Sequence, residues 1–262
     1  MNPETPAPDD EPATDADQDA LPDTIVDILG DHAGLRALLP AGTAPVAADA
    51  PVRFKIRLAG SAGARSRASF LIEKRYAWRG YPLAPHASQP GVVTLVAYDG
   101  PWARATISVG FDGPQGLSAD ALYRTEIDAL RARGARLCEF TRLAVESGPE
   151  SRDLLAMLFH VAYMYAHRLR DFSDLLIEVN PRHESFYRRM LGFRRVGPAR
   201  ACPRVGGAPA VLLWLPLAHA QNQIALHGGE ARRGDAPSRT LYPNFFSPHE
   251  ENGIVGRLRA IG

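Results

Sequence analysis

The chain has 262 residues, enough for one domain with a full hydrophobic core or for two small domains. Its 30 Lys and Arg residues nearly balance 29 Asp and Glu residues, so it lacks the overall charge typical of nucleic-acid-binding and membrane-surface proteins. Two cysteines are too few for a disulfide framework or a zinc site, and a cytoplasmic location is predicted. No export signal or membrane anchor is predicted, because the start is acidic and proline-rich and no long apolar run follows.

The first 50 residues are expected to lie outside the main domain. Residues 1–20 are mainly Pro, Asp, Ala and Thr, a composition typical of a disordered tail. Residues 21–50 are predicted to hold a short helical segment, since Ile25, Ile28 and Leu29 recur at helical spacing, and then a linker.

The main domain opens with a pattern typical of strands. Residues 52–58 alternate apolar and basic side chains, which predicts a half-buried strand, and residues 64–81 then predict a helix. Two β-rich runs at 91–98 and 103–110 flank Asp99-Gly100, a sequence that favours a tight turn. A hairpin is therefore expected.

A strand, a helix and a second strand follow. Ser118 is the expected N-cap of a helix that ends at Gly134. Residues 136–145 and 174–180 predict strands, and residues 151–170 predict a long helix between them. Strands joined by a helical crossover of this length are expected to be parallel neighbours.

The remaining elements complete the expected fold. Residues 184–191 predict a short helix, and residues 193–196 and 210–215 a last pair of strands. The main domain is thus expected to span residues 51–217 and to be α/β, with a mixed central sheet and helices on both faces. Residues 218–262 are expected to be a largely irregular C-terminal extension, because periodicity fades there.

Several segments resemble known acyltransferases. Residues 180–193, NPRHESFYRRMLGF, and the order of the predicted elements resemble the GNAT superfamily. CEFTRLAV, LLIEVNPRH and RACPRVGGAPAVLL resemble the bacterial long-chain N-acyl amino acid synthases, which are relatives of the acyl-homoserine-lactone synthases. The resemblance covers about residues 52–217. It implies a GNAT-like fold and transfer of a long-chain fatty acyl group from acyl carrier protein to the amino group of an amino acid.

The segment after strand 136–145 indicates the acyl donor. Coenzyme-A-dependent relatives carry a glycine-rich loop there, whose backbone N–H groups hold a pyrophosphate. Residues 146–151, ESGPES, contain one glycine, a proline without an N–H and two carboxylates. This favours the acyl-phosphopantetheine of acyl carrier protein as co-substrate, with no permanently bound cofactor and no metal. The resemblance places the pantetheine against Leu143, Ala144 and Val145.

Two residues are candidates for proton transfer. Attack of an amine on a thioester needs a group that accepts a proton from the amine and one that donates a proton to the thiolate. Glu139 is the candidate base, because burial within a strand would raise its pKa. A structural ion pair with an arginine is the alternative. The resemblance implies that Tyr187 protonates the thiolate, and a half-buried helix aromatic is its alternative role.

Arg142 is a candidate for binding the substrate carboxylate, or for a structural ion pair. Three positions separate Glu139 and Arg142, so a regular strand would direct them to opposite faces. The resemblance implies a bulge on this strand that brings them together and turns an N–H within residues 140–143 toward the thioester carbonyl.

Three further residues are candidates for substrate binding: Glu178, Asn180 and His183. Glu178 lies inside a predicted parallel strand and must be paired or protonated if buried. His183 lies near a helix start, where a structural role is the alternative. Cys138 is expected to be a small buried apolar residue, and residues of the helix 151–170, with Phe70, Trp78 and Trp102, are either core or part of an acyl tunnel.

An acidic carrier protein would require a local basic surface. The candidates are a group formed by Arg188, Arg189, Arg194 and Arg195 and a second group formed by Arg131, Arg133 and Arg136. Two other functions remain open: an autoinducer synthase that acylates S-adenosylmethionine, and a non-catalytic acyl-binding relative in which Glu139 is structural.

Overall fold

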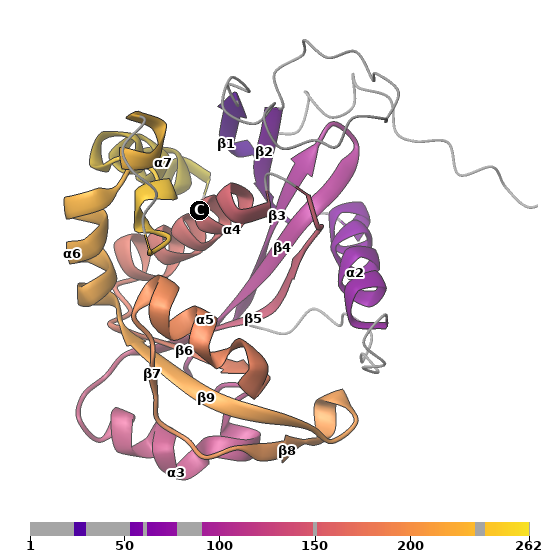
Figure 1. The fold of residues 1–262 in the computed structure, drawn as a ribbon, viewed down its shortest axis with the longest axis vertical. Coiled ribbons are helices and arrows are strands. Elements are labelled where there is room, and N and C mark those ends of the chain that lie inside the picture. Colours follow the sequence, from indigo (N-terminus) through magenta and orange to yellow (C-terminus); the bar gives the residue numbers. More distant parts are fainter. Residues whose placement is uncertain are drawn as a thin grey trace, which may run out of the picture.

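A computed structural model describes residues 24–29, 53–59, 62–77, 91–148, 151–233 and 239–261. Their strands form a mixed sheet in the order β1-β2-β3-β4-β5-β6-β9-β7, and β8 pairs with β9 (Figure 1). The strands are β1 (Thr24–Leu29), β2 (Arg53–Leu58), β3 (Val92–Asp99), β4 (Trp102–Phe111), β5 (Leu137–Val145), β6 (Asp174–Val179), β7 (Arg194–Arg195), β8 (Arg200–Cys202) and β9 (Ala208–Pro216).

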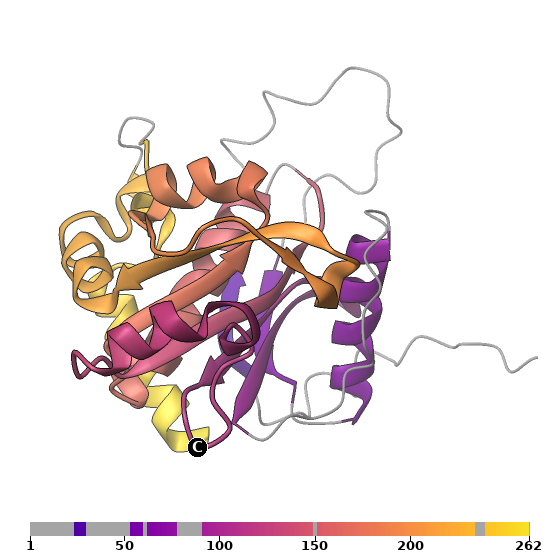
Figure 2. The same cartoon turned by 90° about the horizontal axis from the view of Figure 1, so that it is seen from below.

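Helices cover both faces of the sheet (Figures 1 and 2). The α-helices are α2 (Ala62–Ala77), α3 (Asp120–Arg131), α4 (Ser151–Tyr163), α5 (Pro181–Leu191), α6 (Leu217–His227) and α7 (Pro248–Ile261). A π-helix, η3 (Met164–Leu169), continues α4, and short 3-10 turns are η4 (Pro203–Val205), η5 (Glu230–Arg233) and η6 (Tyr242–Asn244). None of the helices in the described ranges is long and apolar enough to cross a membrane.

The central strands agree with the sequence predictions. β3 and β4 form an antiparallel hairpin around Gly100, whose φ of 53° suits a residue without a Cβ. β5 and β6 are parallel neighbours joined by α4 and η3, as expected for a βαβ unit. The predicted helix 151–170 is present as α4 and η3, and α5 ends at Gly192 with a φ of 83°.

The two faces differ in what they bury. On one face, α4 packs its apolar residues, such as Leu158 and Val161, against Ile107 of β4 and Phe140 of β5. On the other face, α3 covers β5, β6 and β9, while α2 lies over β3, β4 and β5. Because side chains alternate along β5, Cys138 and Phe140 face α4, whereas Glu139 faces the opposite side. Cys138 is buried, as predicted.

Two predictions from the sequence were wrong, one for residues 24–29 and one for the N-cap of α3. Residues 24–29, expected to be helical, form β1, which pairs antiparallel with β2 and extends the sheet. Backbone pairing to a neighbouring strand thus prevails over the helical spacing of the apolar residues. Ser118 is not the N-cap of α3, because Ala119 occupies that position and the Ser118 N–H bonds to Glu139 instead. The predicted tail and linker otherwise lie outside the described residues.

The expectation of a largely irregular C-terminal extension was also wrong. η6 packs onto α4, α7 packs onto η3, and α6 packs onto β9 and η6; together they contribute buried residues to the main core, including Tyr242, Phe245 and Leu258. The Tyr242 hydroxyl donates to the carbonyl of Leu191, 2.7 Å away. Tertiary burial of scattered aromatic residues, rather than local periodicity, orders this segment. The domain therefore continues well beyond residue 217.

Candidate active site

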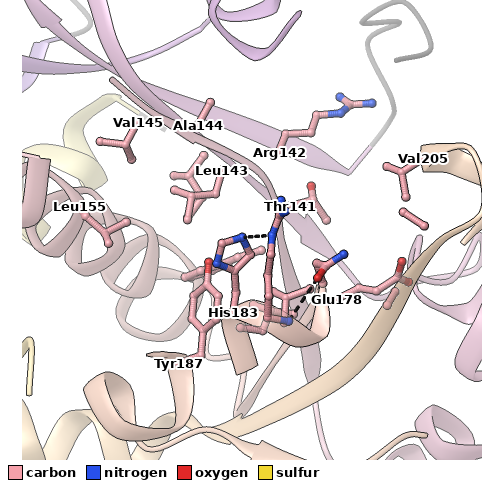
Figure 3. Close-up of a pocket in the computed structure, with 18 of the residues that line it drawn as sticks. Thr141, Arg142, Leu143, Ala144, Val145, Leu155, Glu178, His183, Tyr187 and Val205 are labelled. Carbon is pink, nitrogen blue, oxygen red and sulfur yellow. Dashed lines mark hydrogen bonds between the residues drawn. The ribbon is translucent and has the colours of Figure 1, made fainter. Parts of the chain in front are cut away.

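A cavity of about 630 Å³ opens where β5 and β6 separate (Figure 3). The two strands pair only up to Phe140 and Ile177, although β5 continues to Val145. The volume falls within the usual range of small-molecule sites, about 300–1,000 Å³. Leu143, Ala144 and Val145, the predicted pantetheine-binding residues, all line this cavity. We call it the donor cavity.

The expected bulge is present in β5. Between the pairs Ser108–Thr141 and Thr106–Ala144, two residues of β5 lie opposite one residue of β4. Arg142 is one of the two, and its φ of 52° is uncommon for a residue with a Cβ. The bulge interrupts the regular ladder at the wall of the donor cavity, where the oxyanion donor was expected.

The start of α5 forms another wall of the donor cavity. Asn180 is the N-cap of α5, and its side chain accepts a hydrogen bond from the Arg182 N–H at 3.2 Å. Nε2 of His183 accepts a hydrogen bond from Nε of Arg182 at 3.0 Å, because arginine can only donate. The first turn of α5 therefore holds the His183 ring at the wall of the donor cavity.

Tyr187 lies one turn further along α5 and also lines the donor cavity. Its ring packs against Phe159, Phe186 and Phe193, which fixes the side chain. Figure 3 shows the hydroxyl end directed into the cavity, whereas the Arg142 side chain extends away from Tyr187. Tyr187 is therefore held by aromatic packing while its hydroxyl remains at the cavity.

Glu178 on β6 lines the donor cavity and is paired. Its Oε2 lies 2.6 Å from Nη2 of Arg204, and its side chain is 13% exposed. Arg204 lies in η4, between β8 and β9, and also donates from Nη1 to the carbonyl of Ser118 at 2.7 Å. Glu178 is thus partly buried, and its pairing with Arg204 satisfies the carboxylate at this place in the strand.

Glu139 lies apart from the other candidates. It lines a second cavity of about 460 Å³, bounded by Gly91, Gly110 and residues 113–118, and is not among the residues of the donor cavity. Its oxygens accept hydrogen bonds from Ser118 N at 2.7 Å and from Ala119 N at 3.1 Å. We call this space the acceptor-side cavity.

The surroundings of Glu139 are buried and mainly uncharged. The residue is 4% exposed, and the space for its side chain exists because Gly110 opposite has no Cβ. Burial raises the pKa of the Glu139 carboxyl, while hydrogen bonds from Ser118 and Ala119 and the charge of Arg204 oppose that rise. The carboxylate accepts these hydrogen bonds from backbone amides, rather than pairing with the arginine of the alternative interpretation.

The loop that follows β5 uses its backbone groups internally. The Glu146 N–H donates to the Arg104 carbonyl, and the Ser151 N–H donates to the Gly148 carbonyl. The Glu146 carboxylate pairs with Arg104 at 2.8 Å. Two of the amides that a pyrophosphate would need are therefore already bonded within the protein.

Sequence reasoning missed several residues of the site. Arg204, which contacts Glu178 and Ser118, was only part of a quoted segment, and no spacing pattern signalled its role. Leu155 and Phe159 of α4 line the donor cavity, as proposed for an acyl tunnel. Phe70 and Trp102 do not line it and are 68% and 65% exposed on the surface, and Trp78 lies outside the described residues. Large apolar side chains can lie on the surface as well as in a cavity wall, and periodicity alone does not distinguish the two places.

Comparison with known proteins gives one family and several related folds. Residues 67–216 match the family "N-acyl amino acid synthase FeeM". The structure of FeeM, an N-acyl amino acid synthase from uncultured soil microbes, is 27% identical over 64% of this chain and 92% of that chain, with a TM-score of 0.58. No curated protein sequence matches.

Two acyl-homoserine lactone synthases are also similar, at lower scores. LasI is 15% identical over 63% of this chain and 91% of its own, with a TM-score of 0.44. MesI, described as CoA-dependent, is 15% identical over 67% of this chain and 88% of its own, with a TM-score of 0.41. The GNAT-like fold is confirmed. The family match covers more than half of the chain, so the protein is an acyltransferase that belongs to the FeeM family of N-acyl amino acid synthases.

Proposed function

We propose that the protein transfers a long-chain fatty acyl group from the phosphopantetheine of acyl carrier protein to the amino group of an amino acid. Membership of the FeeM family supports acyl transfer to an amine. The observation that carries the choice of donor is the donor cavity, which ends at a loop with bonded amides and a carboxylate. Such a loop suits a phosphopantetheine arm better than a nucleotide diphosphate.

The donor arm would lie along β5 with its thioester near the bulge. Backbone groups of Leu143, Ala144 and Val145 line the path, and Leu155 and Phe159 supply apolar surface for the acyl chain. The bulge at Arg142 interrupts the strand ladder beside this path. A backbone N–H in this region is the proposed donor to the oxyanion of the tetrahedral intermediate.

The amine would approach Glu139 from the acceptor-side cavity. The amine nitrogen attacks the thioester carbon, the carbon–sulfur bond breaks, and an amide bond forms. Glu139 takes the proton released by the amine, directly or through a water molecule, because burial raises the pKa of its carboxyl toward that of an effective base. Tyr187 provides the proton for the departing thiolate, and the family resemblance supports this role.

Product analysis with two donors tests the proposal. The purified protein is incubated with a mixture of amino acids and either acyl carrier protein or coenzyme A carrying the same acyl chain, and N-acyl amino acids are measured by mass spectrometry. We expect product mainly from acyl carrier protein. Equal specificity constants for the two donors would contradict the choice of donor, and no product from either would contradict the function.

A matched variant pair keeps this test specific. Glu139→Gln should abolish most product, whereas Glu126→Gln should not. Glu126 is also a carboxylate in an ordered element, α3, but it pairs with Arg200 of β8 and lines neither cavity. Equal losses in both variants would indicate a general effect on the fold.

A further inference from the structure

Arg204 connects the two cavities through one peptide group. Its guanidinium donates from Nη1 to the carbonyl oxygen of Ser118 at 2.7 Å. That carbonyl belongs to the same peptide unit as the N–H of Ala119, which donates to Oε2 of Glu139 at 3.1 Å. The cation and the carboxylate therefore occupy the two ends of a single peptide dipole. Hydrogen bonds arranged in such a chain polarise and strengthen one another.

The positive charge of Arg204 is compensated by the carboxylate of Glu178. Nη2 of Arg204 lies 2.6 Å from Oε2 of Glu178, which lines the donor cavity. The chain of contacts thus runs from Glu178 through Arg204 and the Ser118–Ala119 peptide to Glu139. It joins a carboxylate of the donor cavity to the carboxylate of the acceptor-side cavity. Because Glu178 compensates its charge, Arg204 can stay ionised in a partly buried position.

Among the described residues, no other cation is found in the position that Arg204 takes beside the Ser118–Ala119 peptide. Arg131 holds the far side of the loop before α3, but its guanidinium is bonded to three aspartates. The other titratable groups in this region are aspartates and cysteines. Asp112 and Asp120 bind Arg131. Cys138 points to the opposite face of the sheet, and Cys202 lies beside Glu178. Arg204 is the cation whose charge acts on the Glu139 carboxyl.

We propose that Arg204 is a positioning residue for acyl transfer: through its hydrogen bond to the Ser118 carbonyl it fixes the Ser118–Ala119 peptide against Glu139 and so orients that carboxyl group toward the amine. This inference rests on the proposed role of Glu139 as base. Arg204 does not need to touch either substrate. Its effect reaches the reaction through a backbone peptide, and the β8–β9 hairpin that carries it becomes part of the catalytic apparatus.

The pH profile of the reaction separates positioning from mere structural support. A base must be deprotonated, so kcat/KM rises with pH through its pKa. Loss of the Arg204 charge should raise the pKa of Glu139 further and move the acid limb of the profile to higher pH. For Arg204→Met we expect kcat/KM at pH 7 to fall about 10- to 100-fold, with the deficit shrinking as pH rises. Arg204→Lys should lie between this variant and the wild type.

Arg200→Met is the matched control. Arg200 lies on the same hairpin and is anchored in a similar way, to the carbonyl of Leu122 and the carboxylate of Glu126, yet its contacts do not reach Glu139. We expect its pH profile to keep the wild-type position. A deficit in Arg204→Met that is the same at every pH, or one that Arg200→Met reproduces, would overturn the proposal.

A stability cycle tests the contact without any substrate. Thermal unfolding is measured near pH 8 for the wild type, Arg204→Met, Glu139→Gln and the double variant. Arg204→Met should lower Tm by about 2–4 °C more when Glu139 is present than when Gln replaces it. Equal shifts in both backgrounds would overturn the coupling. An absence of N-acyl product from the wild type would instead contradict the proposed function, and the cycle would still decide whether the two residues are coupled.

Discussion

His160 Nε2 lies 3.4 Å from Oε2 of Glu251, although 91 positions separate the two residues in the chain. The other ring nitrogen, Nδ1, accepts a hydrogen bond from the Phe246 N–H at 3.0 Å. His160 is fully buried in α4, so both contacts connect the C-terminal segment to the centre of the domain. The acceptor role of Nδ1 places the ring proton on Nε2, where it can donate to Glu251.

We expect His160→Ala to destabilise the whole domain. The change leaves the buried Phe246 N–H without its acceptor and removes one partner of Glu251, and each unsatisfied group costs about 1–3 kcal/mol. Chemical denaturation measures the free energy of unfolding. His227→Ala is the control, because His227 is half-buried and pairs with Glu230 on its own segment. A similarly small change in both variants would contradict this role of His160.

The same cluster should make the protein sensitive to acid. Burial by itself raises the pKa of Glu251, but the hydrogen bond with His160 and the positive charge of Arg168 outweigh it, and the net pKa is lowered. A carboxyl with a lowered pKa in the folded state contributes stability above its unfolded pKa, about 4.3. That contribution is lost as the pH falls through the folded pKa.

Glu251→Gln should therefore flatten the dependence of stability on pH below about pH 5. The free energy of unfolding is measured by urea titration at several acidic pH values. The variant should be less stable than the wild type near neutral pH, and the difference should narrow as the medium becomes more acidic. A difference that stays constant across the series would show that the Glu251 charge does not contribute.

Gly110→Ala tests the position of Glu139 without removing any functional group. A Cβ at Gly110 would lie 3.0 Å from Cγ and 3.1 Å from Oε1 of Glu139, closer than ordinary contacts. The carboxylate must then shift, and a displacement of about 1 Å in a reacting group can lower the rate about 100-fold. Gly256→Ala is the control, since Gly256 lies on α7, lines neither cavity, and a Cβ added there meets no neighbouring part of the protein within 4 Å. An unchanged kcat/KM in Gly110→Ala would argue against Glu139 as the base.

Glu139→Gln should lower kcat by about 10²–10⁴, the usual effect of losing a general base. A stability cost of about 1–3 kcal/mol should accompany it, because the new amide NH₂ would face the N–H of Ser118 or Ala119. Activity and thermal stability are therefore measured on the same samples. A loss of activity that only parallels the fraction unfolded would favour a structural role.

Tyr187→Phe should reduce turnover less than Glu139→Gln does. The ring keeps its packing against Phe159 and Phe193, and a water molecule can supply the proton for the thiolate. Steady-state kinetics with acyl carrier protein as donor measures the effect. A loss as large as that of Glu139→Gln would show that the hydroxyl is the main acid of the reaction.

The sequence predicted local elements well and long-range contacts poorly. The hairpin at Gly100 and the βαβ unit follow from turn chemistry and periodicity, which are local properties of the chain. The bulge at Arg142 was expected from spacing together with a family resemblance, and the paired strands confirm it. By contrast, β1 forms only because β2 provides a partner, and no local pattern signals such pairing.

In the candidate site, too, local features were predicted from the sequence and long-range contacts were not. Most of the residues chosen from motifs on β5, β6 and α5 line one cavity, because the strand ends meet at one edge of the sheet. Glu139 does not join them, since the strand directs it to the face covered by α3. The contact between Arg204 and the Ser118 carbonyl joins segments 86 positions apart, and no pattern in the sequence predicts it.

The structure also refines the expected docking surface for an acidic carrier protein. Arg188 and Arg195 each pair with Glu184, so part of their charge is already compensated. Within the described part of the chain, no ion pair is found for Arg189 or Arg194, and both are exposed. They lie on α5 and β7, and α5 forms one wall of the donor cavity.

Reversing Arg189 and Arg194 to Glu should therefore raise KM for acyl carrier protein about tenfold and flatten its dependence on salt. The rate with a short pantetheine thioester should hardly change, because this donor reaches the cavity without protein docking. Steady-state kinetics at several salt concentrations gives both values. If the reaction is slowed equally with both donors, these arginines contribute to the fold or to the amine site rather than to docking.

The matched control reverses Arg124 and Arg133, which carry the same total charge and are exposed on the α3 side of the molecule. The neighbouring Arg131 and Arg136 are less suited to receive a partner, because Arg131 binds three aspartates and Arg136 pairs with Asp171. We expect KM for acyl carrier protein to stay near the wild-type value in this control, since a screened surface charge acts only over about 10 Å. A rise in KM confined to the control variant would move the docking surface to the α3 side.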